Sequence, residues 1–152
     1  MNGSLNIKSM NLYNNVDRIF NELNEIGKSD SDNLSIKDLT KFDQFHYHGT
    51  DAIDIAIDLL EINSSSKILD VGSGIGGPAR YIASKTGAKV TAIELQSDQN
   101  NLASNLTNRC GLATKVNHLC GDILDYDFKG QKFDAVVSWL TLYHISNHKI
   151  LL

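Results

Sequence analysis

A cluster of glycines lies where the sequence passes from a short apolar run into a helical pattern, at residues 70–78 (DVGSGIGGP). Glycines in such a place let the chain turn sharply with positive φ and let a ligand touch bare backbone. The helix that follows offers its N-terminal N–H groups to a negative or polar ligand group. The segment therefore predicts a ligand-binding loop between a strand and a helix.

Three carboxylates accompany the loop, each at the end of a predicted strand: Asp70, Glu94 and Asp122. Asp70 can fix the loop or meet a cationic ligand group, directly or through water. Glu94 can accept hydrogen bonds from both hydroxyls of a ribose. Asp122 can accept one from the exocyclic amine of an adenine, with Ile123 against the ring. Together they describe a site for an adenosine with an amino-acid-like tail. The G-x-G-x-x-G spacing of the loop, taken alone, also fits an NAD-dependent dehydrogenase, which is one alternative.

The elements that must position these groups follow from apolar patterns. Strand patterns occupy residues 67–71, 89–94, 116–120 and 133–139, and helical patterns lie between them at residues 77–86 and from Ser97 to Gly111. Strands that alternate with helices of about ten residues predict βαβ units and a parallel sheet. Pro78 suits a first helical turn, Gly87 a helix end, and Ser97 a helix cap.

The first part of the chain differs in composition from the rest and is rich in Asn, Asp and Ser. Apolar residues at helical spacing predict a helix at residues 10–26, and a short helix is expected at residues 35–42. A third helix, capped by Thr50 or Asp51, is expected to run to Glu61. We therefore expect an N-terminal helical cap at residues 1–44 and a binding domain at residues 45–152.

Composition excludes several other classes of protein. The 152 residues carry a formal charge of −4 and are 41% hydrophobic, which is ordinary for one soluble domain. The acidic balance argues against a nucleic-acid surface that works by charge alone. No apolar run is long enough for a membrane span, and the N-terminus lacks a secretory h-region. Two cysteines without metal spacing fit a reducing compartment, so we expect a cytoplasmic protein. The pairs His46/His48 and His144/His148 lack a third ligand, so no metal site is expected.

Four segments in order, ILDVGSGIGG, VTAIEL, CGDILDYDF and FDAVVSWLTLYHI, resemble the leading motifs of the class I S-adenosylmethionine-dependent methyltransferases. The resemblance covers residues 45–152. The variant at residues 76–80 (GGPAR) is most similar to small-molecule enzymes that act on glycine-derived amines or sterols. The resemblance implies a doubly wound, Rossmann-like parallel sheet, S-adenosylmethionine as cofactor, and methyl transfer to a small-molecule acceptor.

The resemblance also implies roles for single residues, each at a position that matches a family motif. Asp70, Gly72, Ser73 and Gly74 would hold the methionine end of the cofactor. Glu94 would hold the ribose hydroxyls, and Leu95 would pack on the adenine, which Asp122 and Ile123 would frame. Trp139 would lie near the methionine or methyl end. Residues 45–49 would help to cover the cofactor and shape the acceptor pocket.

The family's sheet has seven strands in the order 3-2-1-4-5-7-6, whereas this chain reaches Leu152 soon after the fourth. The resemblance therefore implies a C-terminally truncated member with strands 3-2-1-4 only. The fourth strand would become an edge, which invites self-association. A non-catalytic S-adenosylmethionine-binding fragment, or a subunit completed by a partner, is the second alternative.

No general base is required by the sequence, because positioning and desolvation can carry much of the rate of methyl transfer. His46, His48, His144 and Tyr143 are candidates, since removal of a proton from an amine or hydroxyl acceptor would call for such a group. Tyr47, Tyr143 and Trp139 could instead contact a cationic methyl or amine. Arg80 is expected to brace the loop or lie on the surface.

Overall fold

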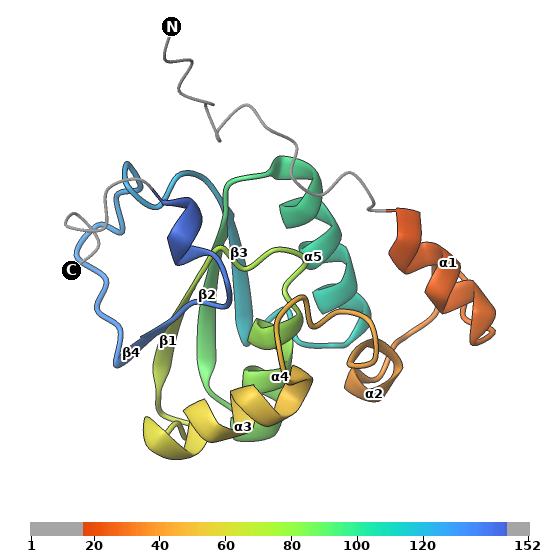
Figure 1. The fold of residues 1–152 in the computed structure, drawn as a ribbon, viewed down its shortest axis with the longest axis horizontal. Coiled ribbons are helices and arrows are strands. Elements are labelled where there is room, and N and C mark those ends of the chain that lie inside the picture. The colour runs from red at the N-terminus through yellow and green to blue at the C-terminus, as the bar shows by residue number, and fades with distance from the viewer. Residues whose placement is uncertain (1–16, 146–152) are drawn as a thin grey trace, which may run out of the picture.

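In the computed structural model, which describes residues 17–145, four parallel strands form one sheet in the order β3-β2-β1-β4 (Figure 1). The strands are β1 (Lys67–Val71), β2 (Lys89–Glu94), β3 (Val116–Cys120) and β4 (Ala135–Val137). Asp70 of β1 pairs with Ala92 of β2 and with Val137 of β4. The predicted α/β class and strand order are confirmed, and β4 is an edge strand of the described sheet.

The helices are α1 (Asp17–Glu25), α2 (Ile36–Leu39), α3 (Gly49–Leu59), α4 (Gly77–Thr86) and α5 (Ser97–Arg109), followed by the 3-10 helix η2 (Leu142–His144). The bounds of α4 match the prediction, with Pro78 in its first turn and Gly87 as its C-cap at φ 76°. Residues 10–16 of the first predicted helix lie outside the described residues.

Two predicted helix caps are wrong. The chain turns into α3 at His48, whose φ is 63°, so Thr50 and Asp51 fall inside the first turn. At α5 the N-cap is Gln96 and Ser97 is already helical. The Gln96 side chain makes no capping hydrogen bond, and its N–H donates to the carboxylate of Glu94, two residues earlier, at 2.9 Å.

The fourth strand is shorter than the predicted residues 133–139, and next to each of its ends a side chain hydrogen-bonds to the backbone of β1. The Asp134 carboxylate accepts from the Lys67 N–H at 2.7 Å, and the Ser138 hydroxyl donates to the Val71 carbonyl at 2.9 Å. Val136, in the middle of β4, is 61% exposed.

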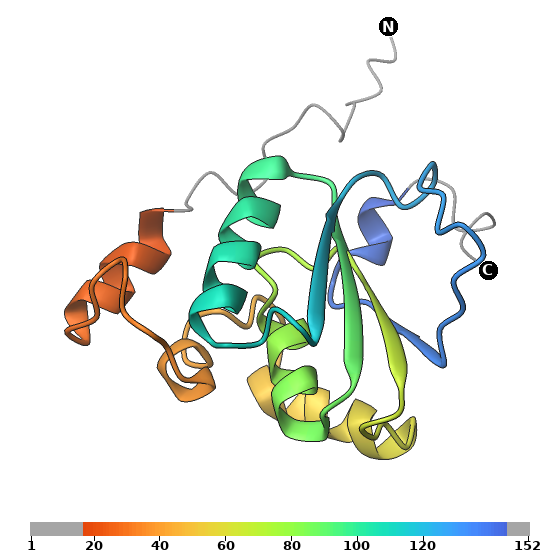
Figure 2. The same cartoon turned by 180° about the vertical axis from the view of Figure 1, so that it is seen from behind.

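The two faces of the sheet are covered differently. On one face, α3 and α4 pack on the even-numbered residues of β1 and β2 in a core that includes Ile53, Ile82 and Ile68. On the other, Leu69, Val71 and Ile93 are covered by apolar and aromatic side chains, mainly from the connection between β3 and β4: Leu119, Ile123, Tyr126, Phe128, Phe133 and Ile145. Figure 2 shows this connection from behind. Among the described residues, no helix is long and apolar enough to cross a membrane.

The N-terminal helices pack beyond α5, on the side of the molecule away from β4 (Figures 1 and 2). Ile19, Leu23 and Leu39 share a buried cluster with Leu102 and Leu106 of α5, and Ile75 of the glycine loop belongs to the same cluster. The segment thus contacts both α5 and the loop. The domain boundary at residue 45 stays a prediction.

Candidate functional site

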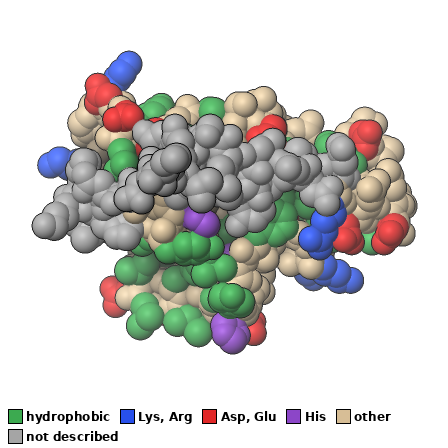
Figure 3. Space-filling view, turned by 45° about the horizontal axis from the view of Figure 1, so that its top comes forward, with side chains coloured by type: hydrophobic (Ala, Val, Ile, Leu, Met, Phe, Trp, Pro, Cys, Tyr) green, Lys and Arg blue, Asp and Glu red, His purple; other side chains and the backbone are tan. Residues whose placement is uncertain are grey.

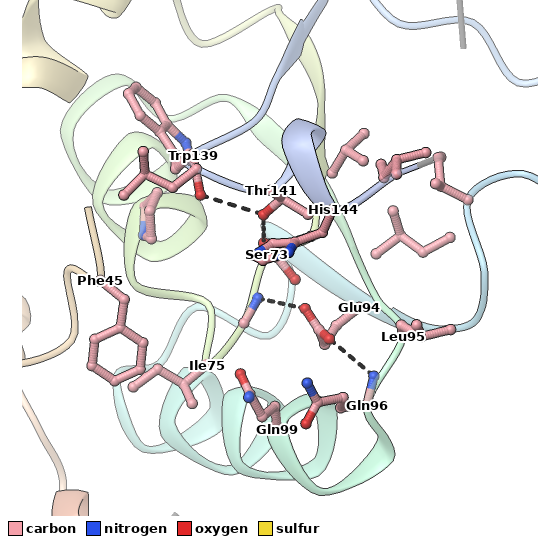
Figure 4. A pocket seen from close by; sticks show the side chains of 18 of the residues that line it. Phe45, Ser73, Ile75, Glu94, Leu95, Gln96, Gln99, Trp139, Thr141 and His144 are labelled. Carbon is pink, nitrogen blue, oxygen red and sulfur yellow. Dashed lines mark hydrogen bonds between the residues drawn. The ribbon is translucent and has the colours of Figure 1, made fainter. Parts of the chain in front are cut away.

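A pocket opens at the carboxyl edge of the sheet, where the strands end and their connections begin (Figure 4). Eight of the nine residues expected to bind a cofactor line it: Gly72, Ser73, Gly74, Glu94, Leu95, Asp122, Ile123 and Trp139. The other lining residues are Asp43, Phe45, His46, Val71, Ile75, Pro78, Ile93, Gln96, Gln99, Gly121, Leu140, Thr141, His144 and Ile145. Figure 3 shows hydrophobic side chains and histidines gathered on one face of the molecule.

The glycine loop is tied to the end of β2. The N–H groups of Gly72 and Ser73 both donate to the carbonyl of Ile93, at 2.9 and 3.1 Å. Gly72 and Gly74 have φ of 69° and 53°, a region that side chains other than glycine rarely adopt. A Cβ at Gly72 would also overlap the side chain of Thr141. The glycines are therefore required both for the turn and for close approach by the segment after β4.

Glu94 links the glycine loop to the start of α5. Its carboxylate accepts from the Gly74 N–H at 2.8 Å and from the Gln96 N–H at 2.9 Å, so each oxygen has one backbone donor (Figure 4). The residue is only 7% exposed. A carboxylate oxygen can accept more than one hydrogen bond, and Glu94 therefore retains acceptor capacity toward the pocket that it lines.

Asp70 is the one expected cofactor residue that does not line the pocket. It lies directly before Val71, is fully buried, and neither of its carboxylate oxygens has a hydrogen-bond partner among the described residues. Its partner in the register is Ala92, so it faces the same side of the sheet as Glu94. Burial and, to a lesser degree, the Glu94 charge raise the pKa of Asp70 to about 7. Both causes disfavour the ionised form of the carboxyl group.

Three predicted residues lie at the ends of β2 and β3. Leu95 is 40% exposed and lines the pocket directly after Glu94. The Asp122 carboxylate accepts from the Leu124 N–H at 3.0 Å, which forms a local turn, and the residue also lines the pocket. Ile123 packs against the core of Val71 and Ile93. The three residues are thus brought to one side of the pocket.

Trp139 is covered by a histidine from a distant part of the chain. The ring of His46 stacks on the indole at 4.8 Å between centroids and an interplanar angle of 28°. The two ring nitrogens of His46 lie 3.1 Å from the Tyr47 carbonyl and 3.1 Å from the Gln44 side-chain oxygen. Because both nitrogens face oxygen acceptors, His46 has no lone pair directed into the pocket in this arrangement.

Two other candidates for proton transfer lie after β4. His144 lines the pocket, and the centroid of its ring lies 3.9 Å from the centroid of the Tyr143 ring. Tyr143 is 66% exposed and Tyr47 is 75% exposed. Within residues 17–145 no group of three potential ligands is arranged to hold a metal ion.

The sequence interpretation missed several polar side chains that border the pocket, above all Gln99 and Thr141. Gln99 is 3% exposed, lies three residues before buried Leu102 on α5, and therefore follows the helical period that identified the apolar face. The Gln99 amide nitrogen, the Ser73 hydroxyl and the Trp139 indole nitrogen are buried without a hydrogen-bond partner among the described residues. Buried donors of this kind usually find partners, so they mark where a polar ligand would bind.

A comparison with known protein families shows to which family the chain belongs. Residues 68–151, more than half of the chain, match the model described as "Methyltransferase domain". The chain belongs to this methyltransferase family. The matched residues include the glycine loop and all the pocket-lining segments except residues 43–46.

Two relatives of this methyltransferase domain come from Arabidopsis thaliana. The 24-methylenesterol C-methyltransferase 2 is 38% identical over 85 residues, which are 56% of this chain and 24% of that protein. The chloroplastic tocopherol O-methyltransferase is 44% identical over 72 residues, 47% of this chain and 21% of that protein. The chain therefore spans less than a quarter of the length of either relative.

The fold is also similar to a solved methyltransferase structure. The S-adenosylmethionine-dependent methyltransferase from Thiobacillus denitrificans, solved in complex with S-adenosyl-L-homocysteine, superposes with a TM-score of 0.57 over 78% of this chain and 46% of that chain, at 21% identity. The similarity supports a Rossmann-like methyltransferase fold for this chain.

Proposed function

We propose that this chain binds S-adenosylmethionine in the pocket at the carboxyl edge of the sheet and serves methyl transfer to a small-molecule acceptor. The observation that carries the proposal is the Glu94 carboxylate. It is held at the end of β2 by the N–H groups of Gly74 and Gln96, and the pocket that it lines also contains buried donors that have no partner within residues 17–145. An acceptor so placed suits the two hydroxyls of a ribose.

The residues present fit the proposed cofactor along the length of the pocket. Ser73 and the glycine loop supply a hydroxyl and backbone for the methionine end, and Asp70 supplies a buried acid behind it. At the other end, Leu95 and Ile123 supply apolar surface, and Asp122 supplies an acceptor for an adenine amine. Gln99, whose amide nitrogen is unpaired among the described residues, adds a donor between the two ends. Trp139 would border the methionine or methyl end.

When bound, S-adenosylmethionine supplies a methyl group activated by its sulfonium. The task left to this chain is to hold donor and acceptor in line and to exclude water, which can account for much of the rate. Ile75, Phe45 and Trp139 provide apolar walls for this. His144 borders the pocket and is a better placed candidate for proton removal than His46, whose nitrogens face other acceptors. Tyr143 stays a weaker candidate because its side chain is largely exposed.

The acceptor is proposed to be an apolar small molecule. Several large hydrophobic side chains in and after the segments that form the pocket are exposed: Phe45, Tyr47, Leu140, Leu142 and Tyr143. Two relatives are named for methylation of a sterol and of tocopherol, which are both apolar acceptors. Self-association through β4 and a cytoplasmic location stay predictions.

Calorimetric titration of the chain with S-adenosylhomocysteine, with NADH as the control, tests the proposal. We expect micromolar binding of S-adenosylhomocysteine and none of NADH. Binding of NADH alone would favour the dehydrogenase alternative. A well-folded chain that binds neither compound would contradict the proposal for this chain by itself. Binding without turnover across an acceptor panel would favour the non-catalytic or partner-completed alternative.

A further inference from the structure

Arg80 is an unusual residue for its position, because its side chain is completely buried in α4. A buried charge is costly unless it is paired and hydrogen-bonded. The guanidinium forms an ion pair with Asp43, with Nη2 and Oδ2 3.0 Å apart and the two side chains 0% and 2% exposed. A buried pair of this kind is often no more stabilising than apolar residues of the same volume. Stability alone therefore does not explain Arg80, and its contacts give another reason.

The first contact is with the glycine loop. Arg80 Nη1 donates to the Ile75 carbonyl at 2.7 Å, and the N–H of Gly76 donates to the Ser73 carbonyl at 2.9 Å. The peptide group between Ile75 and Gly76 is thus held at both ends. Its orientation fixes the turn of the loop that borders the pocket.

The second contact is with the segment at residues 43–46, which contributes Asp43, Phe45 and His46 to the lining of the pocket. Asp43 Oδ1 accepts from the Gln44 side-chain amide at 2.8 Å, and Gln44 Oε1 lies 3.1 Å from His46 Nε2. His46 in turn stacks on Trp139. A continuous series of side-chain contacts therefore runs from buried Arg80 to the aromatic wall of the pocket.

The close contact between residues 43–46 and α4 depends on a glycine. A Cβ at Gly77 would overlap the carbonyl of Asp43, so the segment lies directly on the first turn of the helix. Both carboxylate oxygens of Asp43 are used within the protein, by Arg80 and by Gln44. Asp43 borders the pocket, but its charge is directed to Arg80.

We propose that Arg80 and Asp43 are positioning residues for the pocket: their buried ion pair holds the glycine loop on one side and the 43–46 segment on the other in the arrangement that binds the ligand. The proposal rests on the proposed function for the identity of that ligand. It makes the N-terminal segment part of the binding apparatus, although it lies outside the matched family segment.

The test separates positioning from stability. The single variants Asp43→Asn and Arg80→Met leave a buried group without its partner and should lower the melting temperature. The double variant Asp43→Asn/Arg80→Met removes the unpaired charge, so its melting temperature should recover toward the wild-type value. We expect its Kd for S-adenosylhomocysteine to stay about tenfold or more above wild type, as expected for the loss of one hydrogen bond to a charged group.

Tryptophan fluorescence gives a second readout, which does not depend on ligand binding. Trp139 is the only tryptophan of the chain, so all indole emission comes from the pocket wall. Indole emission responds to contact with a stacked imidazole ring, so release of His46 should change the emission of the double variant. Gln44→Leu breaks the link between Asp43 and His46 without altering the ion pair, and should change the emission as well. Asp54→Asn, which removes the partly exposed ion pair between Asp54 of α3 and Lys85 of α4, is the matched control and should change neither Kd nor emission.

The outcomes are distinguishable. If the wild-type chain does not bind S-adenosylhomocysteine, the proposed function fails and the emission measurements still test the positioning. Wild-type Kd and emission in a stably folded double variant would overturn the positioning proposal. If the double variant does not fold, wild-type emission and Kd in Gln44→Leu would overturn the link to the pocket wall.

Discussion

Replacement of Asp70 by asparagine should stabilise the ligand-free protein at neutral and higher pH. The carboxyl group is fully buried, has no hydrogen-bond partner among the described residues, and has its pKa raised from 3.8 to about 7. A folded-state pKa above the unfolded value means that the native state binds the proton more tightly. The stability contributed by the protonated acid is therefore complete below about pH 4 and is lost as the pH rises to about 7.

The size of the effect follows from the shift. A rise of about three units, at about 1.4 kcal/mol for each, corresponds to about 4 kcal/mol of stability lost by wild type above pH 7. Asparagine has nearly the same shape and cannot ionise, so the variant should not show this loss. For a chain of this length, about 4 kcal/mol corresponds to a melting temperature roughly 8–16 °C higher.

The assay is thermal unfolding of both proteins, followed by circular dichroism at pH 4, 6 and 8. The difference between variant and wild type should be small at pH 4 and largest at pH 8. Asp38→Asn is the control of opposite sign, because the Ser35 N–H lowers the pKa of Asp38 and its ionised form is the stabilising one. A variant no more stable than wild type at pH 8 would refute the reasoning, since it would mean that the Asp70 carboxylate is solvated or paired. The same variant should bind S-adenosylhomocysteine more weakly, which would separate stability from function at one residue.

Three further predictions concern Glu94 in the pocket and two positions outside its lining, Gly77 and His118. Glu94→Gln should weaken binding of S-adenosylhomocysteine by roughly 1–3 kcal/mol in calorimetry, and unchanged affinity would contradict the ribose assignment. Gly77→Ala should destabilise by about 1–3 kcal/mol because its Cβ overlaps the Asp43 carbonyl; since alanine favours helices, a stabilised variant would show that the overlap is absent. Burial and the nearby Arg80 charge lower the pKa of His118 to about 4. Wild type should therefore lose about 3 kcal/mol of its free energy of unfolding as the pH falls from 6.5 to 4. His118→Asn should not show this loss when unfolding is followed by urea titration.

Much of the sheet and its helices could be predicted from the sequence because those features depend on local patterns. The apolar period and the flanking glycines located α4, and the alternation of strands and helices predicted a parallel sheet, whereas the strand order came from the family resemblance. The glycine loop and Glu94 could be placed near one another because the carboxyl ends of parallel strands meet at one edge. The caps of α3 and α5 were misplaced, because α3 begins after a left-handed His48 and α5 begins after Gln96, whose N–H donates to the carboxylate of Glu94 two residues earlier.

Only the tertiary structure shows which groups the polar side chains contact. The sequence left Arg80 either as a brace for the loop or as a surface charge, and its burial depends on Asp43, which is 37 residues away. The stack of His46 on Trp139 joins segments even further apart in the chain. The predicted fourth strand was too long at both ends, where the side chains of Asp134 and Ser138 form hydrogen bonds with Lys67 and Val71 of β1. Local patterns fix where the backbone forms helices and strands, whereas the partners of a buried charge are chosen by the packing of the whole chain.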